Sequence, residues 1–167
     1  MPVSFDEDLA RLAIQEERLQ FDTFNSNTAL DIGMRLKALI ESWGKKAAFD
    51  IQLAGHPLFF FAMAGTTPDN VDWIRRKRNV VMRFHKSSYA FSLGVQKNGH
   101  SLVERFGAGT DQLILSGGGF PIRLRGSGVV GSITVSGLPQ RDDHGVIVQV
   151  LADLLGEDID ELALAAE

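Results

Sequence analysis

A glycine-rich run near the C-terminus constrains the fold of this chain more than any other feature. Residues 114–138 have the sequence ILSGGGFPIRLRGSGVVGSITVSGL. Alternating apolar residues that are interrupted by glycines predict two strands joined by a tight turn. Because glycine has no side chain, the backbone at the rim of such a hairpin can be approached closely by a ligand or by another chain. The mostly helical spacing of apolar residues over 142–155 then predicts a closing helix.

The first half of the chain predicts three helices. Capping residues and apolar spacing indicate one helix over residues 4–19 and a second that runs from the caps at 25–28 to Gly44. Thr67 followed by Pro68 is typical of a helix start and predicts a third helix to about His85.

Other segments predict strands. Residues 47–53 alternate apolar and polar side chains, and the apolar run 58–64 follows a Gly-His-Pro turn, which indicates a hairpin inside the sheet. Residues 111–116 predict a further strand before the glycine hairpin. We expect 87–93 to continue or close the third helix, and 94–110 to be rich in loops. The element order predicts an α+β fold with helices on the faces of a mostly antiparallel sheet.

Length and composition fit a single domain. With 167 residues, of which 44% are apolar and 23% charged, the chain is long enough to build one hydrophobic core. We therefore expect one domain over 1–167, with the N-terminal helix at 4–19 and an acidic C-terminal tail at 156–167.

Charge and cysteine content argue against several function classes. The net charge of −4 gives no general attraction to nucleic acid or anionic lipid, and no apolar run approaches the roughly 20 residues that span a bilayer. The chain has no cysteine, which excludes disulfides, thiolate metal sites and cysteine nucleophiles. We expect a cytoplasmic protein that binds neither nucleic acid nor a membrane.

A histidine beside two carboxylates is the sharpest candidate for chemistry. His144 follows Asp142 and Asp143 near the predicted start of the closing helix. A carboxylate fixes the tautomer of an imidazole and raises its basicity, as a general base or a metal ligand requires, so His144 and Asp143 are the candidate catalytic residues. The two aspartates also suit the positive end of a helix dipole, and the sequence leaves both interpretations open.

A cationic helix face is the second candidate. Arg75 and Arg78 lie three residues apart, so they share one face of the third helix and can hold a phosphate or a carboxylate. Ser87 and Ser88 follow this helix and offer hydroxyls that either cap a helix or face a ligand. The alternative is a solvated helix face that pairs with nearby aspartates.

The backbone of Gly117, Gly118 and Gly119 is the third candidate, because its N–H groups can face an anion. The run lacks the Gly-Lys-Ser/Thr end of a phosphate-binding loop, and the later G-S-G-V-V-G lies within a strand pair, unlike a dinucleotide fingerprint. Neither a serine-hydrolase elbow nor a zinc-type histidine spacing is present, so we expect no metal site. Alternatively, these glycines only allow the chain to form a tight turn and bind no ligand.

Three motifs together resemble a known family. They are GHPLF at 55–59, DNVDWIRRKRNVVMRFHKSSY at 69–89, and the glycine hairpin at 117–138 followed by DDH at 142–144. Over residues 21–155 the chain resembles the haem-degrading-domain family, which includes HbpS-like, GlcG-like and PduO C-terminal-like proteins, and in particular an uncharacterised cytosolic branch. The resemblance implies a profilin-like three-layer fold with a five-stranded antiparallel sheet, a symmetric homo-oligomer, and relatives that bind haem or a corrinoid.

These observations leave three hypotheses open. The first is a homo-oligomer that binds a small anionic ligand or a tetrapyrrole between the helix of Arg75 and Arg78, the two serines and the glycine rim, with His144 nearby. The second is an enzyme in which His144 and Asp143 form a base or a metal site. The third is a structural or adaptor protein without catalysis, whose exposed motifs form subunit contacts.

Overall fold

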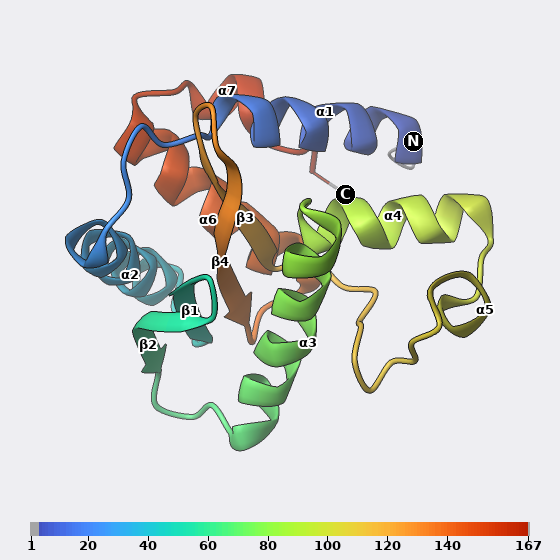
Figure 1. Ribbon diagram of the computed structural model, residues 1–167. Helices are drawn as coiled ribbons and strands as arrows, with labels where there is room; N and C mark the ends of the chain where they lie inside the picture. The colour runs from blue at the N-terminus through green and yellow to red at the C-terminus, as the bar shows by residue number, and fades with distance from the viewer. Residues whose placement is uncertain (1–3, 167) are drawn as a thin grey trace.

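The computed structural model describes residues 4–166, and Figure 1 shows its helices and strands. In chain order they are α1 (Phe5–Arg18), α2 (Ser26–Ser42), β1 (Ala48–Leu53), β2 (His56–Ala62), α3 (Pro68–Phe84), α4 (Ser88–Asn98), α5 (Leu102–Phe106), β3 (Gly119–Leu124), β4 (Gly128–Ser136), α6 (Gln140–Leu155) and α7 (Ile159–Leu162). None of these helices is long and apolar enough to cross a lipid bilayer.

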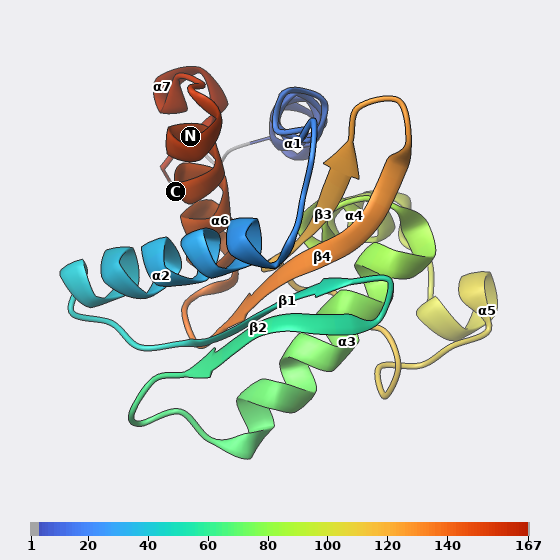
Figure 2. The same ribbon diagram turned by 60° about the vertical axis from the view of Figure 1, so that its left-hand side comes forward.

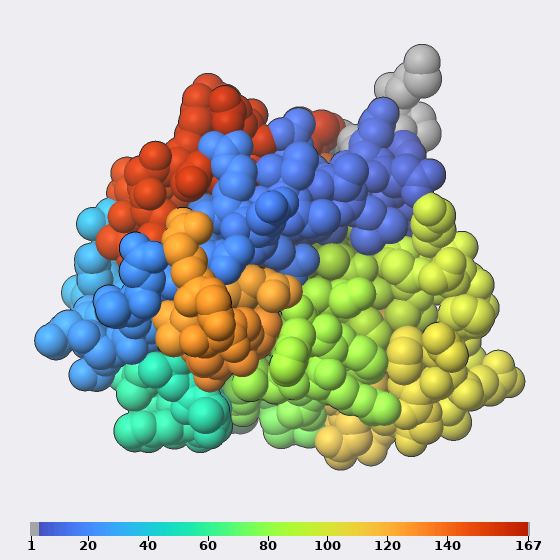
Figure 3. Space-filling model, turned by 45° about the horizontal axis from the view of Figure 1, so that its top comes forward, coloured from blue at the N-terminus to red at the C-terminus, as the bar shows by residue number. Residues whose placement is uncertain are grey.

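The strands form an antiparallel sheet in the order β2-β1-β4-β3. The first hairpin turns at Ala54 and Gly55, which have positive φ angles of 48° and 79°. Positive φ at both central residues is what a tight two-residue hairpin turn requires. The second hairpin turns at 125–127, and Figure 3 shows this turn, in orange, at the surface beside the first hairpin, in teal. Both predicted hairpins are confirmed.

The prediction of five strands is wrong, since the described part of the chain forms a four-stranded sheet. Residues 111–116, expected as a strand, form a turn and an irregular segment. Leu113 is buried there, and Leu115 packs beside it in a cluster with side chains of α3, α4 and α5. These leucines therefore serve a helical layer instead of the sheet. At the outer edge of β3, Phe21 makes an isolated parallel bridge to Leu124.

One face of the sheet carries the main hydrophobic core. Phe49, Ile51, Ile133 and Val135 are fully buried on this face and pack with buried side chains of α2 and α6. Figure 2 shows α2 and α6 above the sheet and α3 beneath it. The expected α+β architecture, with helices on both sides of an antiparallel sheet, is confirmed.

The helix on the other face, α3, begins and ends as the sequence predicts. Thr67 is the N-cap, and Pro68 is the first helical residue. His85 ends the helix in the left-handed conformation, with a φ of 55°. Because this conformation stops a helix, residues 87–93 do not continue α3.

These residues instead begin a separate helix, α4. Ser87 is its N-cap, and the Ser87 hydroxyl accepts a hydrogen bond from the backbone N–H of Ala90. The region 94–110, expected to be rich in loops, contains the end of α4 and all of α5.

The two ends of the described chain pack against each other. α1 has Ser4 as its N-cap, and α7 lies beside it in Figure 1. Gln15 donates a hydrogen bond of 2.7 Å to the carbonyl of Leu162, which is fully buried, and Arg18 pairs with Glu157. The segment expected as an acidic tail at 156–167 is therefore held against α1 over its described part.

β2 is an edge strand with exposed aromatic side chains. Phe60 is 50% exposed and Phe61 is 38% exposed, although the apolar run of this strand predicts burial. An unpaired strand edge with apolar side chains is a surface on which another chain can dock.

Candidate functional site

The sheet face that α3 covers is polar. Because side chains alternate along a strand, Asp50 and Gln52 point away from the main core. On β4, Thr134 pairs with Asp50 and Ser132 pairs with Gln52, so these four side chains share one face of two neighbouring strands. We call them the polar strip; α3 contacts both of its strands.

An ion pair joins the polar strip to α3. Arg78 Nη1 lies 2.6 Å from Asp50 Oδ2, and Gln52 Nε2 donates a hydrogen bond of 3.0 Å to the same oxygen. Asp50 is only 4% exposed, and this burial raises the pKa of its carboxyl to about 6, although the positive charge of Arg78 opposes the rise. The other oxygen, Asp50 Oδ1, is buried and has no hydrogen-bond partner in the described part of the chain.

A groove of about 620 Å³ opens between α3 and the strands β1 and β2. Such a volume lies within the range of sites for small molecules. We call it the α3 groove, and its lining residues are Asp50, Gln52, Pro57, Phe60, Pro68, Val71, Asp72, Ile74, Arg75 and Arg78. Its walls are thus largely apolar, while its charged groups come from one strand and one helix.

Arg75 lies on the same groove as Arg78, as their spacing predicts. Its Nε donates to Asp72 Oδ1 at 3.0 Å, and its Nη2 donates to the carbonyl of Asp111 at 2.8 Å. The side chain remains 40% exposed. Arg75 and Arg78 therefore present two guanidinium groups of different burial to the same groove.

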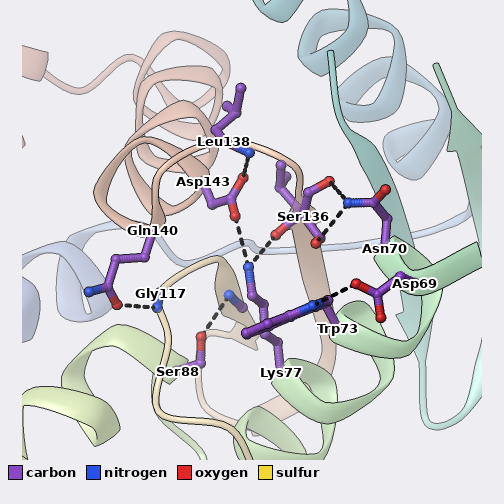
Figure 4. Close-up of polar contacts among 12 residues, drawn as sticks. Asp69, Asn70, Trp73, Lys77, Ser88, Gly117, Ser136, Leu138, Gln140 and Asp143 are labelled. Carbon is purple, nitrogen blue, oxygen red and sulfur yellow. Dashed lines mark hydrogen bonds and ion pairs between the residues drawn. The ribbon is translucent and has the colours of Figure 1, made fainter. Parts of the chain in front are cut away.

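The glycine turn lies elsewhere and is tightly packed. Gly117, Gly118 and Gly119 are all buried. The backbone N–H of Gly119 donates to Ser88 Oγ at 2.9 Å, and the N–H of Gly117 donates to Gln140 Oε1 at 3.1 Å (Figure 4). Gly118 has a φ of 123°, and a Cβ there would overlap the carbonyl oxygen of Val135 and the amine of Lys77. For Gly117 and Gly119, side-chain oxygens thus occupy the positions in which the sequence predicts an anion.

A buried lysine beside this turn joins α3 to β4 and α6. Lys77 Nζ lies 2.8 Å from Asp143 Oδ2 and donates to the carbonyl of Val135 at 2.9 Å (Figure 4). Asp143 Oδ1 accepts a hydrogen bond of 2.9 Å from the N–H of Leu138. Burial raises the pKa of Asp143 and lowers the pKa of Lys77, while their mutual attraction opposes both changes. We call Lys77, Ser88, Gly117–Gly119 and Asp143 the buried polar cluster; Gln140, which contacts Gly117, is exposed.

His144 is buried and does not contact Asp143 by a hydrogen bond. Its Nε2 lies 2.7 Å from Gln15 Oε1. Because the Gln15 amide nitrogen donates to the carbonyl of Leu162, this oxygen is an acceptor, and His144 Nε2 carries the proton. Burial lowers the pKa of His144 to about 3, so the imidazole is neutral. The described residues contain no group of three or more acidic or histidine side chains placed to hold a metal ion.

The structure divides the predicted site residues between two places. The three glycines, Ser88 and Asp143 belong to the buried polar cluster, and His144 follows in α6. Arg75 and Arg78 lie together in the α3 groove. The binding and catalytic roles assigned to these residues remain predictions.

The sequence does not identify Asp50 and Lys77 as site residues. The alternation of β1 does place Asp50 opposite the apolar positions, but that pattern is typical of a side chain facing solvent. Lys77 lies within the cationic run of α3, where the sequence offers no sign that one of the charges is buried.

The sequence and the fold both match known proteins. A family described as haem degrading protein HbpS-like matches residues 24–152. A UPF0303 protein of Azotobacter vinelandii is 50% identical over 162 residues, which is 97% of this chain and 98% of the relative. The crystal structure of the Ybr137w protein superposes with a TM-score of 0.81 at 28% identity, covering 93% of this chain and 90% of that one. A PduOC:heme complex superposes with a TM-score of 0.63 at 16% identity, over 78% and 92% of the two chains.

Proposed function

This chain belongs to the HbpS-like haem-degrading family and is a relative of the UPF0303 proteins, and from that premise we propose that it binds a small organic acid with an apolar body in the α3 groove. The observation that carries the proposal is the placement of Arg75 and Arg78 in one largely apolar groove. A guanidinium group forms strong, oriented hydrogen bonds to carboxylate and phosphate groups.

The apolar walls supply the second half of recognition. Pro57, Phe60, Val71 and Ile74 line the groove beside the charged groups. Burial of ligand carbon against such walls contributes about 25 cal/mol for each Å² removed from water. An acid with an aromatic or aliphatic body therefore contacts both the guanidinium groups and the apolar walls, whereas an inorganic anion contacts only the guanidinium groups.

A tetrapyrrole with carboxylate side chains is one member of this ligand class. Relatives in the structural comparison include a PduOC:heme complex. The described residues that line the α3 groove, however, include no histidine, cysteine, methionine or tyrosine, which are the usual axial ligands of haem iron. The residues present fit the acidic groups of a tetrapyrrole and do not fit its iron.

We propose binding in preference to catalysis. A general base must reach the proton that it removes, and its pKa works best near the operating pH. His144 is fully buried, with a pKa lowered to about 3, and Asp143 is engaged by Lys77 and by the N–H of Leu138. These features favour binding over proton transfer by either group.

We also propose that the protein acts in the cytoplasm, a location that the lack of cysteine favours.

We further propose that copies of the chain associate through β2. Phe60 and Phe61 are exposed on this edge strand. Light scattering is expected to show a dimer or a larger assembly for the wild type and a smaller species for Phe61→Ser. Val103→Ser, an exposed change on α5, is the control and leaves the mass unchanged. A monomeric wild type would overturn the assembly.

Porphyrin titration tests the ligand class. Haemin and protoporphyrin IX are added separately while tryptophan fluorescence and the Soret band are recorded. Because the proposed mode does not use the iron, both are expected to bind with similar affinity. Arg75→Gln is expected to weaken both about tenfold, as loss of a charge-assisted hydrogen bond does.

Arg35→Gln is the matched control. Arg35 is 39% exposed and pairs with Asp31 of its own helix, much as Arg75 pairs with Asp72, but it lies on α2, on the other side of the sheet. If Arg75→Gln does not weaken porphyrin binding, tetrapyrroles do not bind in the α3 groove. If the aromatic carboxylate hydrocinnamate also fails to shift amide NMR signals of the groove residues, the proposed function is wrong.

A further inference from the structure

Asp50 uses only one of its two carboxylate oxygens. Arg78 and Gln52 both donate to Oδ2, at 2.6 and 3.0 Å, while Oδ1 has no donor within the described residues. The Asp50 side chain is 6% exposed, and it lines the α3 groove. A buried carboxylate oxygen without a donor is costly, so this atom is suited to accept a hydrogen bond from a ligand.

Besides Asp50 Oδ1, the polar strip contains two more oxygens without a hydrogen-bond partner among the described residues. Thr134 pairs with Asp50 across the sheet, and Ser132 pairs with Gln52. The hydroxyl oxygens of Thr134 and Ser132 are buried, and neither has a hydrogen-bond partner among residues 4–166. Side chains directly opposite each other on neighbouring strands lie about 5 Å apart at Cβ. The strip that α3 covers is thus a concentrated buried polar surface, and its residues Asp50 and Gln52 also line the groove.

The position for a donor lies next to the position for an acid. Arg78 contacts Asp50 directly, and in the described chain that is the one hydrogen-bond partner of its guanidinium. A ligand carboxylate on Arg78 and a ligand donor on Asp50 Oδ1 are therefore neighbours. Only a molecule whose donor is a few bonds from its carboxylate can use both groups at once.

The charges of the groove favour a ligand without net charge. Its charged lining residues are Asp50, Asp72, Arg75 and Arg78, which sum to zero. A simple acid adds an uncompensated negative charge to this largely apolar space, whereas a zwitterion adds none.

We propose that the ligand of the α3 groove is an α-amino acid, or a molecule ending in one, with an apolar side chain. This inference rests on the proposed function and narrows its ligand class. The carboxylate binds Arg78 and Arg75, the ammonium donates to Asp50 Oδ1, and the side chain packs on the apolar walls.

Three probes of the same shape test the proposal. L-phenylalanine, phenyllactate and hydrocinnamate carry an ammonium group, a hydroxyl or only hydrogen on the carbon beside the carboxylate. Binding is measured by calorimetry and by amide NMR at about pH 8, where Asp50 is ionised because its pKa is raised only to about 6. Phenylalanine is expected to bind at least about tenfold more tightly than hydrocinnamate.

Asp50→Asn removes the charge and keeps the shape. It is expected to abolish most of the preference for phenylalanine, because phenylalanine loses the partner of its ammonium group while hydrocinnamate gains from the uncompensated charge of Arg78. Asp31→Asn, an exposed change on α2, is the control and keeps the preference. Since the comparison of the three probes needs only the wild type, the proposal can be judged even if Asp50→Asn does not fold.

The outcomes separate this inference from the proposed function. If hydrocinnamate binds the groove as tightly as phenylalanine, the organic-acid function stands and the amino-acid inference is wrong. If phenyllactate binds more tightly than phenylalanine, the group that donates to Asp50 is a hydroxyl and not an ammonium group, and the ligand is a hydroxy acid. If none of the three small probes binds while porphyrins bind in an Arg75-dependent manner, the inference is also overturned, and the function stands.

Discussion

Replacing His144 by glutamine tests whether this histidine is an accessible base or a buried structural residue. The pKa of His144 is lowered to about 3 in the folded chain, against 6.5 for a solvated histidine. Between these values the unfolded chain binds a proton that the folded chain does not, so stability is lost as the pH falls below 6.5. Each pH unit in this window costs about 1.4 kcal/mol. The expected loss from His144 is therefore about 2 kcal/mol at about pH 5, relative to about pH 7.5.

Urea unfolding followed by circular dichroism measures this loss. His144→Gln keeps an N–H for Gln15 Oε1 and removes the titrating ring. The difference in unfolding free energy between wild type and variant is expected to change by about 2 kcal/mol between about pH 7.5 and about pH 5, because only the wild type loses the histidine contribution. Asp50 and Asp143, which also have raised pKa values, are present in both proteins and cancel from the difference.

His100→Gln is the control, since His100 is exposed in the segment between α4 and α5. The pH dependence of the His144→Gln difference is expected to exceed that of the His100→Gln difference. If the His144→Gln difference stays constant within about 0.5 kcal/mol over the same range, His144 takes up protons in the folded state. The buried, neutral histidine would then be the wrong description, and a catalytic role would regain support.

Two further predictions concern stability and use the same assay. Lys77→Met leaves the Asp143 carboxylate buried without its cation and is expected to lower the free energy of unfolding by about 3–5 kcal/mol. Adding Asp143→Asn should restore part of this loss. A loss below about 1 kcal/mol for Lys77→Met would show that the ion pair is dispensable. Gly131→Ala places a Cβ onto the carbonyl oxygen of Gln52 and is expected to cost about 1–3 kcal/mol. Gly145→Ala, within α6 and with no heavy atom in its way, should stabilise by about 0.5–1 kcal/mol, and equal effects at the two glycines would contradict the close approach of β1 and β4.

Much of the fold follows from local signals in the sequence. The cap at Asn25, the Thr67–Pro68 start and the glycines of the second hairpin each act within a few residues, so their elements can be predicted without the rest of the chain. The segment 111–116 has the apolar content of a strand, but Leu113 packs against helices that are distant in sequence. Tertiary contacts determine the conformation of this segment, and a local sequence pattern does not contain them.

The candidate site was predictable to a smaller extent. The three-residue spacing of Arg75 and Arg78 correctly places them on one helix face and, in the structure, on one groove. The same spacing says nothing about Asp50, which becomes part of the groove only because α3 covers the polar side of β1. Likewise, the sequence does not show that the N–H groups of Gly117 and Gly119 are engaged, because their acceptors, Gln140 and Ser88, lie more than twenty residues away in sequence.

The cationic run of α3 shows why charges counted along a sequence do not describe a surface. Successive helical residues are rotated by about 100°, so four neighbouring cations point in different directions. Arg76 lies over the ring of Trp73 at 4.6 Å and pairs with Asp72, and Lys77 is buried in the polar cluster. The other two, Arg75 and Arg78, line the α3 groove. A run of four cations therefore provides two for a ligand, which suits recognition of a single acidic group better than binding of an extended polyanion.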